Sequence, residues 1–184
     1  MLLERNRAHL LVVDIQARLL PHIYNADQVL LNTELLLVAA RRLGVPVTVS
    51  EQYPKGLGPT VDKLNAFIEG AKVMEKMHFS CAADAEIRRR VRHLDQAEGR
   101  DQLVIVGIEA HVCVLQSALG FAQAGQHVAV VADATGSRRL ENHEKALKRL
   151  RHNDIEVVTA EMVLFEWLGV AGTDEFRELS KLIK

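Results

Sequence analysis

The sequence predicts an α/β fold in which helices cover both faces of a six-stranded, mostly parallel sheet. Six short apolar or β-branched segments are separated by loops and helix-length amphipathic segments, the rhythm of crossover units. Several of these segments are apolar without alternation, which is typical of parallel strands buried on both faces. The chain has 184 residues, 48% of them hydrophobic and 26% charged, which favours one globular domain over residues 1–184.

Residues 9–60 predict a strand, a helix, a second strand and a loop, in that order. Residues 9–14 (HLLVVD) form a continuous apolar run that ends in a carboxylate, and we expect a buried strand there. Residues 27–43 follow with a helical stripe of apolar side chains, and Gly44 is the stop signal. Residues 45–50 (VPVTVS) are β-branched and predict the second strand, whereas residues 51–60 are rich in Gly and Pro and predict a loop.

The middle of the chain continues the pattern. Residues 71–76 predict a short third strand, followed by a helix from residue 81 or 82 to 96 that Gly99 closes. Residues 102–107 (QLVIVG) form the most apolar strand, and residues 112–124 predict the next helix.

The last third supplies two more strands and three helices. We expect strands at residues 127–133 and 155–159 and a charged helix between them at 142–152. Residues 161–168 and 174–182 predict two closing helices.

Right-handed crossovers of these units give a three-layer α-β-α, Rossmann-like arrangement with the strand order 3-2-1-4-5-6. Ligands of such sheets bind outside the carboxyl ends of the strands, where the order reverses, here between the first and fourth strands. Asp14 ends the first strand, Lys76 ends the third, and Cys113 follows the fourth. We therefore expect these three residues to meet in one crevice.

These residue types suit nucleophilic acyl or C–N bond chemistry. A thiol at a helix start next to an ammonium is favoured as thiolate, and a carboxylate can accept and return its proton. Backbone N–H groups at the helix start can hold an oxyanion. Taken singly, Asp14 is explained as a cap, Lys76 as a solvated cation and Cys113 as inert packing, so only their joint position favours catalysis.

Six segments in this order resemble the isochorismatase-like cysteine hydrolases, especially their small isochorismatase domain-containing branch. They cover the chain nearly from end to end, and GIEAHVCVLQSAL with an upstream VVDIQ is the most specific part. The segments are LLVVDIQARLLP at 10–21, VSEQYPKGLGPT at 49–60, EKMHFSC at 75–81, GIEAHVCVLQSAL at 107–119, VVADATGSR at 130–138 and TAEMVLFEWLG at 159–169.

The resemblance implies an Asp–Lys–Cys triad. Asp14 would be the general acid/base, Lys76 the group that orients the thiol and lowers its pKa, and Cys113 the nucleophile. It also implies a cis peptide bond between Ile108 and Glu109, which turns the amides of Glu109 and Cys113 toward one point as an oxyanion hole.

One departure concerns the metal that nicotinamidases of this family bind through Asp-x-His after the second strand. The equivalent residues 51–54 contain no histidine, so we expect no metal and no cofactor. The expected reaction is hydrolysis of a small amide, carbamate or related C–N substrate through a thioester on Cys113. Two alternatives remain: a catalytically idle member that binds a small molecule or a partner, and a nicotinamidase-like amidase with an unusual metal site.

The surroundings of the triad supply candidate pocket residues. Gln16, Leu19 and Phe79 are expected to contact substrate or wall the pocket, whereas Tyr53 and Gln52 either face the pocket or pack in a loop. We expect Cys81 to be a packing residue near the site. His111 lies two residues before Cys113, and its side chain either forms a Cys–His dyad or serves only to cap or pack.

Composition excludes other classes of protein. A net charge of −1 and 4% aromatic residues argue against binding of nucleic acid or of a membrane, and the arginines at 88–90 spread around a helix.

Two cysteines, no signal peptide and no spanning segment favour a cytoplasmic location. The resemblance also implies a homo-oligomer, a dimer or larger. Residues 162–168 with Trp167 form either an interface patch or a cover for the sheet.

Overall fold

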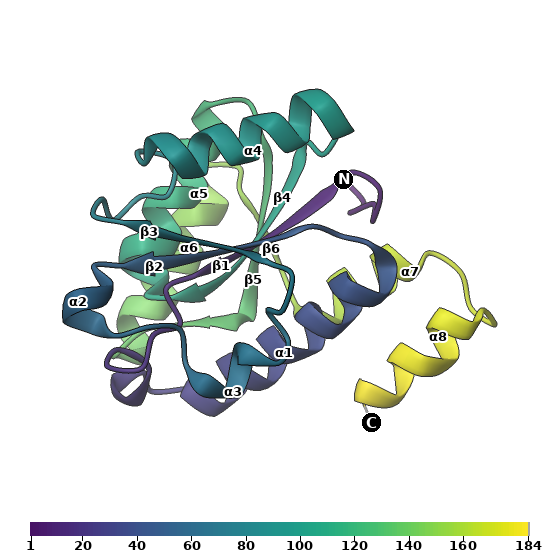
Figure 1. Cartoon of the computed structure of the whole chain (residues 1–184), viewed down its shortest axis with the longest axis horizontal. Coiled ribbons are helices and arrows are strands. Elements are labelled where there is room, and N and C mark those ends of the chain that lie inside the picture. The colour runs from purple at the N-terminus through teal and green to yellow at the C-terminus, as the bar shows by residue number, and fades with distance from the viewer. Residues whose placement is uncertain (184) are drawn as a thin grey trace.

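The computed structural model describes residues 1–183, and its six strands form one parallel sheet in the order β3-β2-β1-β4-β5-β6 (Figure 1). The predicted strand order and the α/β class are confirmed. The strands are β1 (Ala8–Val13), β2 (Val47–Gln52), β3 (Lys72–Lys76), β4 (Gln102–Ile108), β5 (His127–Gly136) and β6 (Glu156–Val158).

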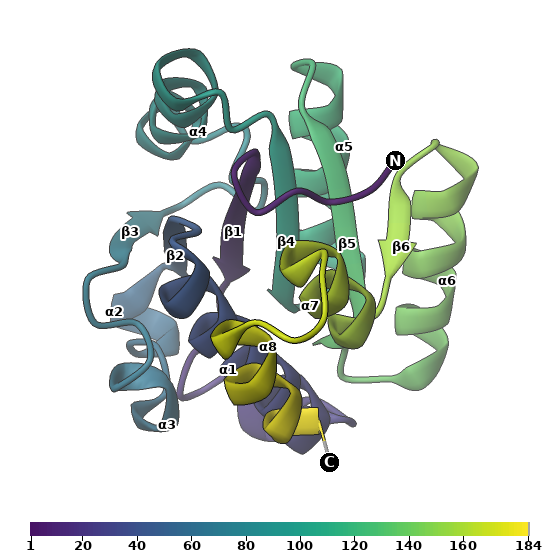
Figure 2. The ribbon, with the colours of Figure 1, turned by 90° about the vertical axis from the view of Figure 1, so that its right-hand side faces the viewer.

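Helices cover both faces of the sheet, as Figure 2 shows. Side chains of α1 and α7 pack on one face, and side chains of α4, α5 and α6 pack on the other. The helices are α1 (Ala26–Leu43), α2 (Pro54–Leu57), α3 (Asp62–Asn65), α4 (Ala85–Glu98), α5 (Leu115–Gln123), α6 (Leu140–His152), α7 (Ala160–Leu168) and α8 (Asp174–Leu179). Short 3₁₀ turns lie at Leu20–His22 and Ser180–Ile183, and a π-helical turn lies at Ala110–Val114.

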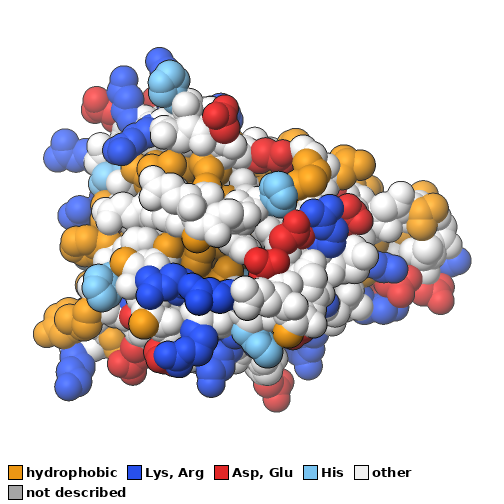
Figure 3. All heavy atoms as spheres, turned by 90° about the horizontal axis from the view of Figure 1, so that it is seen from above, with side chains coloured by type: hydrophobic (Ala, Val, Ile, Leu, Met, Phe, Trp, Pro, Cys, Tyr) orange, Lys and Arg blue, Asp and Glu red, His pale blue; other side chains and the backbone are white. Residues whose placement is uncertain are grey.

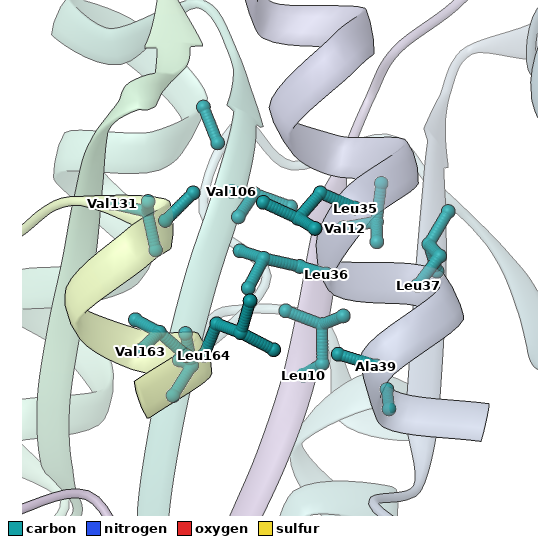
Figure 4. Close-up of a cluster of buried hydrophobic side chains, with 14 of the residues drawn as sticks. Leu10, Val12, Leu35, Leu36, Leu37, Ala39, Val106, Val131, Val163 and Leu164 are labelled. Carbon is teal, nitrogen blue, oxygen red and sulfur yellow. The ribbon is translucent and has the colours of Figure 1, made fainter. Parts of the chain in front are cut away.

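The unbroken apolar run of β1 follows from burial on both faces. Leu10 and Val12 join the larger hydrophobic cluster under α1 and α7, which Figure 4 shows. Leu11 and Val13 join the second cluster, under α4 and α5. Successive side chains of a strand point to opposite faces, so a strand covered on both sides needs apolar residues throughout.

Two helix starts differ from the sequence prediction. The helix expected from residue 81 or 82 begins at Ala85, because the side chain of Asp84 accepts hydrogen bonds from the amides of Glu86 and Ile87 and caps it. The helix expected over 112–124 is instead the π-helical turn followed by α5. Cys113 therefore lies inside a π-helical turn, five residues after Ile108, the last residue of β4.

The C-terminal segment covers the sheet. Trp167 of α7 is fully buried in the larger cluster, so of the two alternatives for residues 162–168 its position fits the cover for the sheet. The face seen from above in Figure 3 carries acidic, basic and hydrophobic side chains side by side. Among residues 1–183, none of the helices has the length and apolar character needed to cross a membrane.

Candidate active site

Asp14 follows the last residue of β1 and turns the chain out of the sheet. Its φ of 53° lies in the left-handed region, which Asp tolerates better than most residues. Its buried carboxylate accepts a hydrogen bond from the Ser50 hydroxyl at 2.7 Å through Oδ1 and pairs with Lys76 through Oδ2. Both oxygens of Asp14 are therefore held by side chains from β2 and β3.

Lys76 is the last residue of β3, and its ammonium reaches across the end of β2. Nζ donates to Asp14 Oδ2 at 2.6 Å and to Gln52 Oε1 at 2.8 Å, and the side chain is as buried as that of Asp14. The amide nitrogen of Gln52 donates in turn to the carbonyl of Met77. The Lys76 ammonium is thus held between two oxygen acceptors, Asp14 Oδ2 and Gln52 Oε1.

Cys113 completes the cluster from the π-helical turn after β4. Its side chain is 5% exposed, and its thiol interacts with Asp14 and Lys76. The structure therefore brings together the three residues that the sequence placed at strand ends, although they come from three separate parts of the chain.

The proton affinities differ from the expectation that Lys76 and a helix start depress the thiol pKa. Burial and the Asp14 carboxylate raise the pKa of Cys113, and the ammonium of Lys76 offsets them only in part. Burial also raises the pKa of Asp14, against the opposing effect of Lys76 and Ser50. For Lys76, burial lowers the pKa but the Asp14 carboxylate outweighs it, so the pKa is raised. The Lys76–Asp14 pair therefore lies beside a thiol that holds its proton more tightly than a free cysteine does.

The loop after β4 is fixed from two sides. The peptide bond between Ile108 and Glu109 is cis. The buried carboxylate of Glu109 accepts from the backbone amide of Arg138 at 2.9 Å and from its Nε at 3.1 Å. Gly107 pairs with Val13, and a Cβ at Gly107 would overlap the Val13 carbonyl oxygen, so only glycine permits this approach of β4 to β1.

Comparison with protein families decides the assignment. The family model described as the isochorismatase domain matches residues 8–162. This chain belongs to the isochorismatase family.

Curated relatives agree with the family assignment. The chain is 36% identical over 174 residues to isochorismatase domain-containing protein 2 of Danio rerio, a match that covers 95% of this chain and 85% of that protein. It is 38% identical to isochorismatase domain-containing protein 1 of the same fish, but this match spans 93% of this chain and only 59% of that protein. A secreted isochorismatase effector of Phytophthora sojae is 35% identical, with 95% of this chain and 83% of that protein covered.

Solved structures show the same isochorismatase-family fold. The MAR1 ribonuclease of Caenorhabditis elegans matches with a TM-score of 0.91 and 30% identity and covers 100% of this chain and 92% of its own. The YcaC gene product of Escherichia coli, described as an octameric hydrolase of unknown specificity, matches with a TM-score of 0.90 and 25% identity, covering 99% and 90%. These neighbours support a hydrolase fold.

The expected pocket residues of this isochorismatase-family chain lie in different settings. Gln16 is buried, and its side-chain nitrogen donates to the carbonyls of Gln52 and Gly58. Its side-chain oxygen accepts from the backbone amide of Gln52. The side chain therefore holds the loops together and does not present its amide to a ligand. Leu19 is half-buried against the larger cluster. Tyr53 and Phe79 are 46% and 55% exposed, so their rings lie at the surface.

Two other residues singled out in the sequence are also placed. Cys81 is buried, and its sulfur lies 3.5 Å from the Ser50 hydroxyl, which makes it a direct neighbour of the site. The ring of His111 bonds with the Ser137 hydroxyl at 3.0 Å and the Asn142 amide at 3.4 Å, as expected of a packing histidine.

Ser50 and the side chain of Glu109 are site residues that sequence analysis missed. The available signal for Ser50 was a polar residue at the carboxyl end of an otherwise β-branched strand, on the same sheet edge as Asp14. As for metals, within residues 1–183 no three His, Cys, Asp or Glu side chains converge as a ligand set.

Proposed function

We propose that this chain is a metal-independent cysteine hydrolase that cleaves the C–N bond of a small amide, carbamate or related substrate. The observation that carries the proposal is the 2.6 Å ion pair of Lys76 and Asp14, fully buried beside the Cys113 thiol. A buried carboxylate held by a lysine next to a thiol is the arrangement that a base-activated nucleophile needs.

In the first half-reaction, the Cys113 thiol passes its proton to Asp14 while the sulfur attacks the acyl carbon. The carbonyl oxygen becomes an oxyanion, which accepts hydrogen bonds from the backbone amides of Glu109 and Cys113. Asp14 then gives the proton to the leaving nitrogen, the C–N bond breaks, and an amine departs from a thioester on Cys113. The raised pKa of Asp14 favours this role, because it makes the carboxylate a stronger base than an exposed one.

In the second half-reaction, Asp14 takes a proton from a water molecule that attacks the thioester. The C–S bond breaks, an acid is released, and the proton returns to the sulfur of Cys113. Lys76 stays protonated throughout, because the Asp14 carboxylate raises its pKa. Its role is to hold Asp14 in position and to stabilise negative charge in the transition state.

Burial limits the size of the substrate. Cys113 is 5% exposed, so a compact acyl group reaches the sulfur more easily than a polymer does. A hollow of about 300 Å³ lies at the end of β3, and its lining residues do not include Asp14 or Cys113; they are Pro54, Glu75, Lys76, Met77, His78 and Asp84. We also propose a homo-oligomer, by analogy with the octameric neighbour, and a reducing, cytoplasmic setting that keeps both thiols free.

The test is a screen of small amides and carbamates with the wild-type chain and the Cys113→Ala variant. We expect hydrolysis by the wild-type chain, none by the variant, and an acyl adduct on the intact protein that peptide mapping places on Cys113. An adduct on Cys81, or equal turnover by the variant, would contradict the mechanism.

RNA is the second candidate substrate, because a neighbour with a TM-score of 0.91 is named a ribonuclease. The same screen therefore includes single-stranded RNA. If Cys113→Ala still cleaves RNA, ribonuclease activity would replace the proposed function. If the wild-type chain turns over no substrate in the screen but still binds a ligand, an idle binding protein would be favoured.

A further inference from the structure

Ser50 lies between Asp14 of the triad and Cys81, a buried thiol that the proposed mechanism does not use. Its hydroxyl donates to Asp14 Oδ1 at 2.7 Å, and the thiol of Cys81 donates to Ser50 Oγ at 3.5 Å. Ser50 and Cys81 are both fully buried. Burial and the Asp14 carboxylate raise the pKa of Cys81 to about 11, so this thiol keeps its proton and remains a donor.

We propose that Ser50 is a positioning residue that sets the orientation and the basicity of Asp14 through its hydrogen bond to Oδ1. This inference rests on the proposed function of Asp14 as the base for Cys113. Because the Cys81 thiol donates to the serine oxygen, the hydroxyl proton of Ser50 is directed to the carboxylate. A hydrogen bond donated to a carboxylate favours its charged form.

The hydrogen bond from Ser50 gives the two oxygens of Asp14 different partners. Oδ1 is occupied by Ser50 from β2, and Oδ2 faces Lys76 from β3. The other titratable groups that act on this carboxylate are the thiols of Cys113 and Cys81. With Oδ1 held, the carboxylate cannot rotate freely, and its remaining acceptor capacity is directed to the ammonium and to the nucleophile.

The test measures the rate of Cys113 alkylation by iodoacetamide against pH, with peptide mapping to separate Cys113 from Cys81. Alkylation requires Asp14 as base but needs no substrate, so it reports on Ser50 even if no amide is hydrolysed. In Ser50→Ala the acidic limb of the profile moves to higher pH by about one unit, because Asp14 loses a stabilising donor. Ser50→Thr keeps the hydroxyl and restores the wild-type limb.

Thr48→Ala is the matched control, because Thr48 lies on the same strand and its buried hydroxyl bonds with His9 at 2.8 Å, away from Asp14. Its alkylation profile stays at the wild-type position. Should Ser50→Ala not fold, Cys81→Ala removes the donor behind Ser50 and gives a smaller shift in the same direction. A wild-type profile in folded Ser50→Ala, or an equal shift in Thr48→Ala, would overturn the inference.

Discussion

Replacing Lys76 by Met tests whether the buried ion pair dominates the electrostatics of the site. The charges are 2.6 Å apart and both side chains are fully buried. At an effective dielectric constant of about 20, unit charges at this separation attract each other by about 6 kcal/mol. Much of this attraction offsets the removal of two ions from water, whereas deleting one partner leaves the other unpaired at a loss of about 3–5 kcal/mol. We therefore expect Lys76→Met to lower the free energy of unfolding by that amount at pH 8.

The sign of the pH dependence is specific to this variant. Without Lys76, the pKa of Asp14 in the folded state rises further above its unfolded value, because burial already raises it and its opposing cation is gone. Lowering the pH protonates Asp14 and relieves the penalty, so the loss of stability shrinks below the folded pKa. Between the folded-state pKa of Asp14 in the wild-type chain and its higher value in Lys76→Met, the loss relative to the wild-type chain grows by about 1.4 kcal/mol per unit of rising pH.

Urea denaturation at pH 5 and pH 8 is the assay. Lys72→Met is the control, since Lys72 lies on the same strand but is exposed, and its loss is within about 0.5 kcal/mol. The double variant Asp14→Asn/Lys76→Met removes the unpaired charge and flattens the pH dependence. Equal losses in Lys72→Met and Lys76→Met, or a pH-independent loss in Lys76→Met, would refute the reasoning.

Three further predictions concern the sheet and the loop after β4. Burial, with Arg90 and Arg100, lowers the pKa of His9 from 6.5 to about 3, so the free energy of unfolding falls as pH drops below 6.5. His9→Gln removes up to about 1.4 kcal/mol per pH unit of that slope, measured by urea denaturation. Gly107→Ala loses about 2–4 kcal/mol of stability, because its Cβ meets the neighbouring strand at a φ of 118°. Arg138→Met removes the Nε donor to the Glu109 carboxylate and leaves only the backbone donor, so the loop that carries the Glu109 amide is held less firmly, and we expect kcat for the amide found in the screen to fall on the order of tenfold with little change in KM.

Matched changes separate these effects from general damage. Gly125 also has a positive φ, 94°, but a Cβ there meets nothing within 4 Å, so Gly125→Ala lowers the free energy of unfolding by only about 1 kcal/mol. Arg139→Met removes an exposed arginine next to Arg138 and leaves kcat unchanged. A flat stability of the wild-type chain between pH 6.5 and pH 4, equal losses at Gly107 and Gly125, or equal kcat in both arginine variants would contradict the respective predictions.

The topology of the site could be predicted from the sequence because it follows from strand order alone. Asp14, Lys76 and Cys113 end or follow three strands, and parallel strands bring their carboxyl ends to one edge. The apolar run of β1 and the glycine stops of α1 and α4 set these elements with few competing signals.

The acid–base state of the site could not be predicted in the same way. The expectation of a depressed thiol pKa used the charge of Lys76 and a helix dipole, and it left out burial. In the structure Cys113 lies in a π-helical turn, is almost completely buried and interacts with a carboxylate, so its pKa is raised. Proton affinities depend on separations of a few ångströms and on burial, and sequence patterns specify neither.

The hydrophobic packing behind the site also influences its chemistry. Cys81 and Cys113 both belong to the second cluster, together with Val13, which precedes Asp14. The apolar side chains that stabilise this face of the sheet therefore exclude water from the thiols and from the carboxylate, and burial is the largest influence raising the pKa of Asp14, Cys81 and Cys113. When both the donor and the acceptor of a proton lose solvation together, the proton can pass between them without either ion meeting water. A change that lets water into this cluster would thus alter the proposed proton transfer.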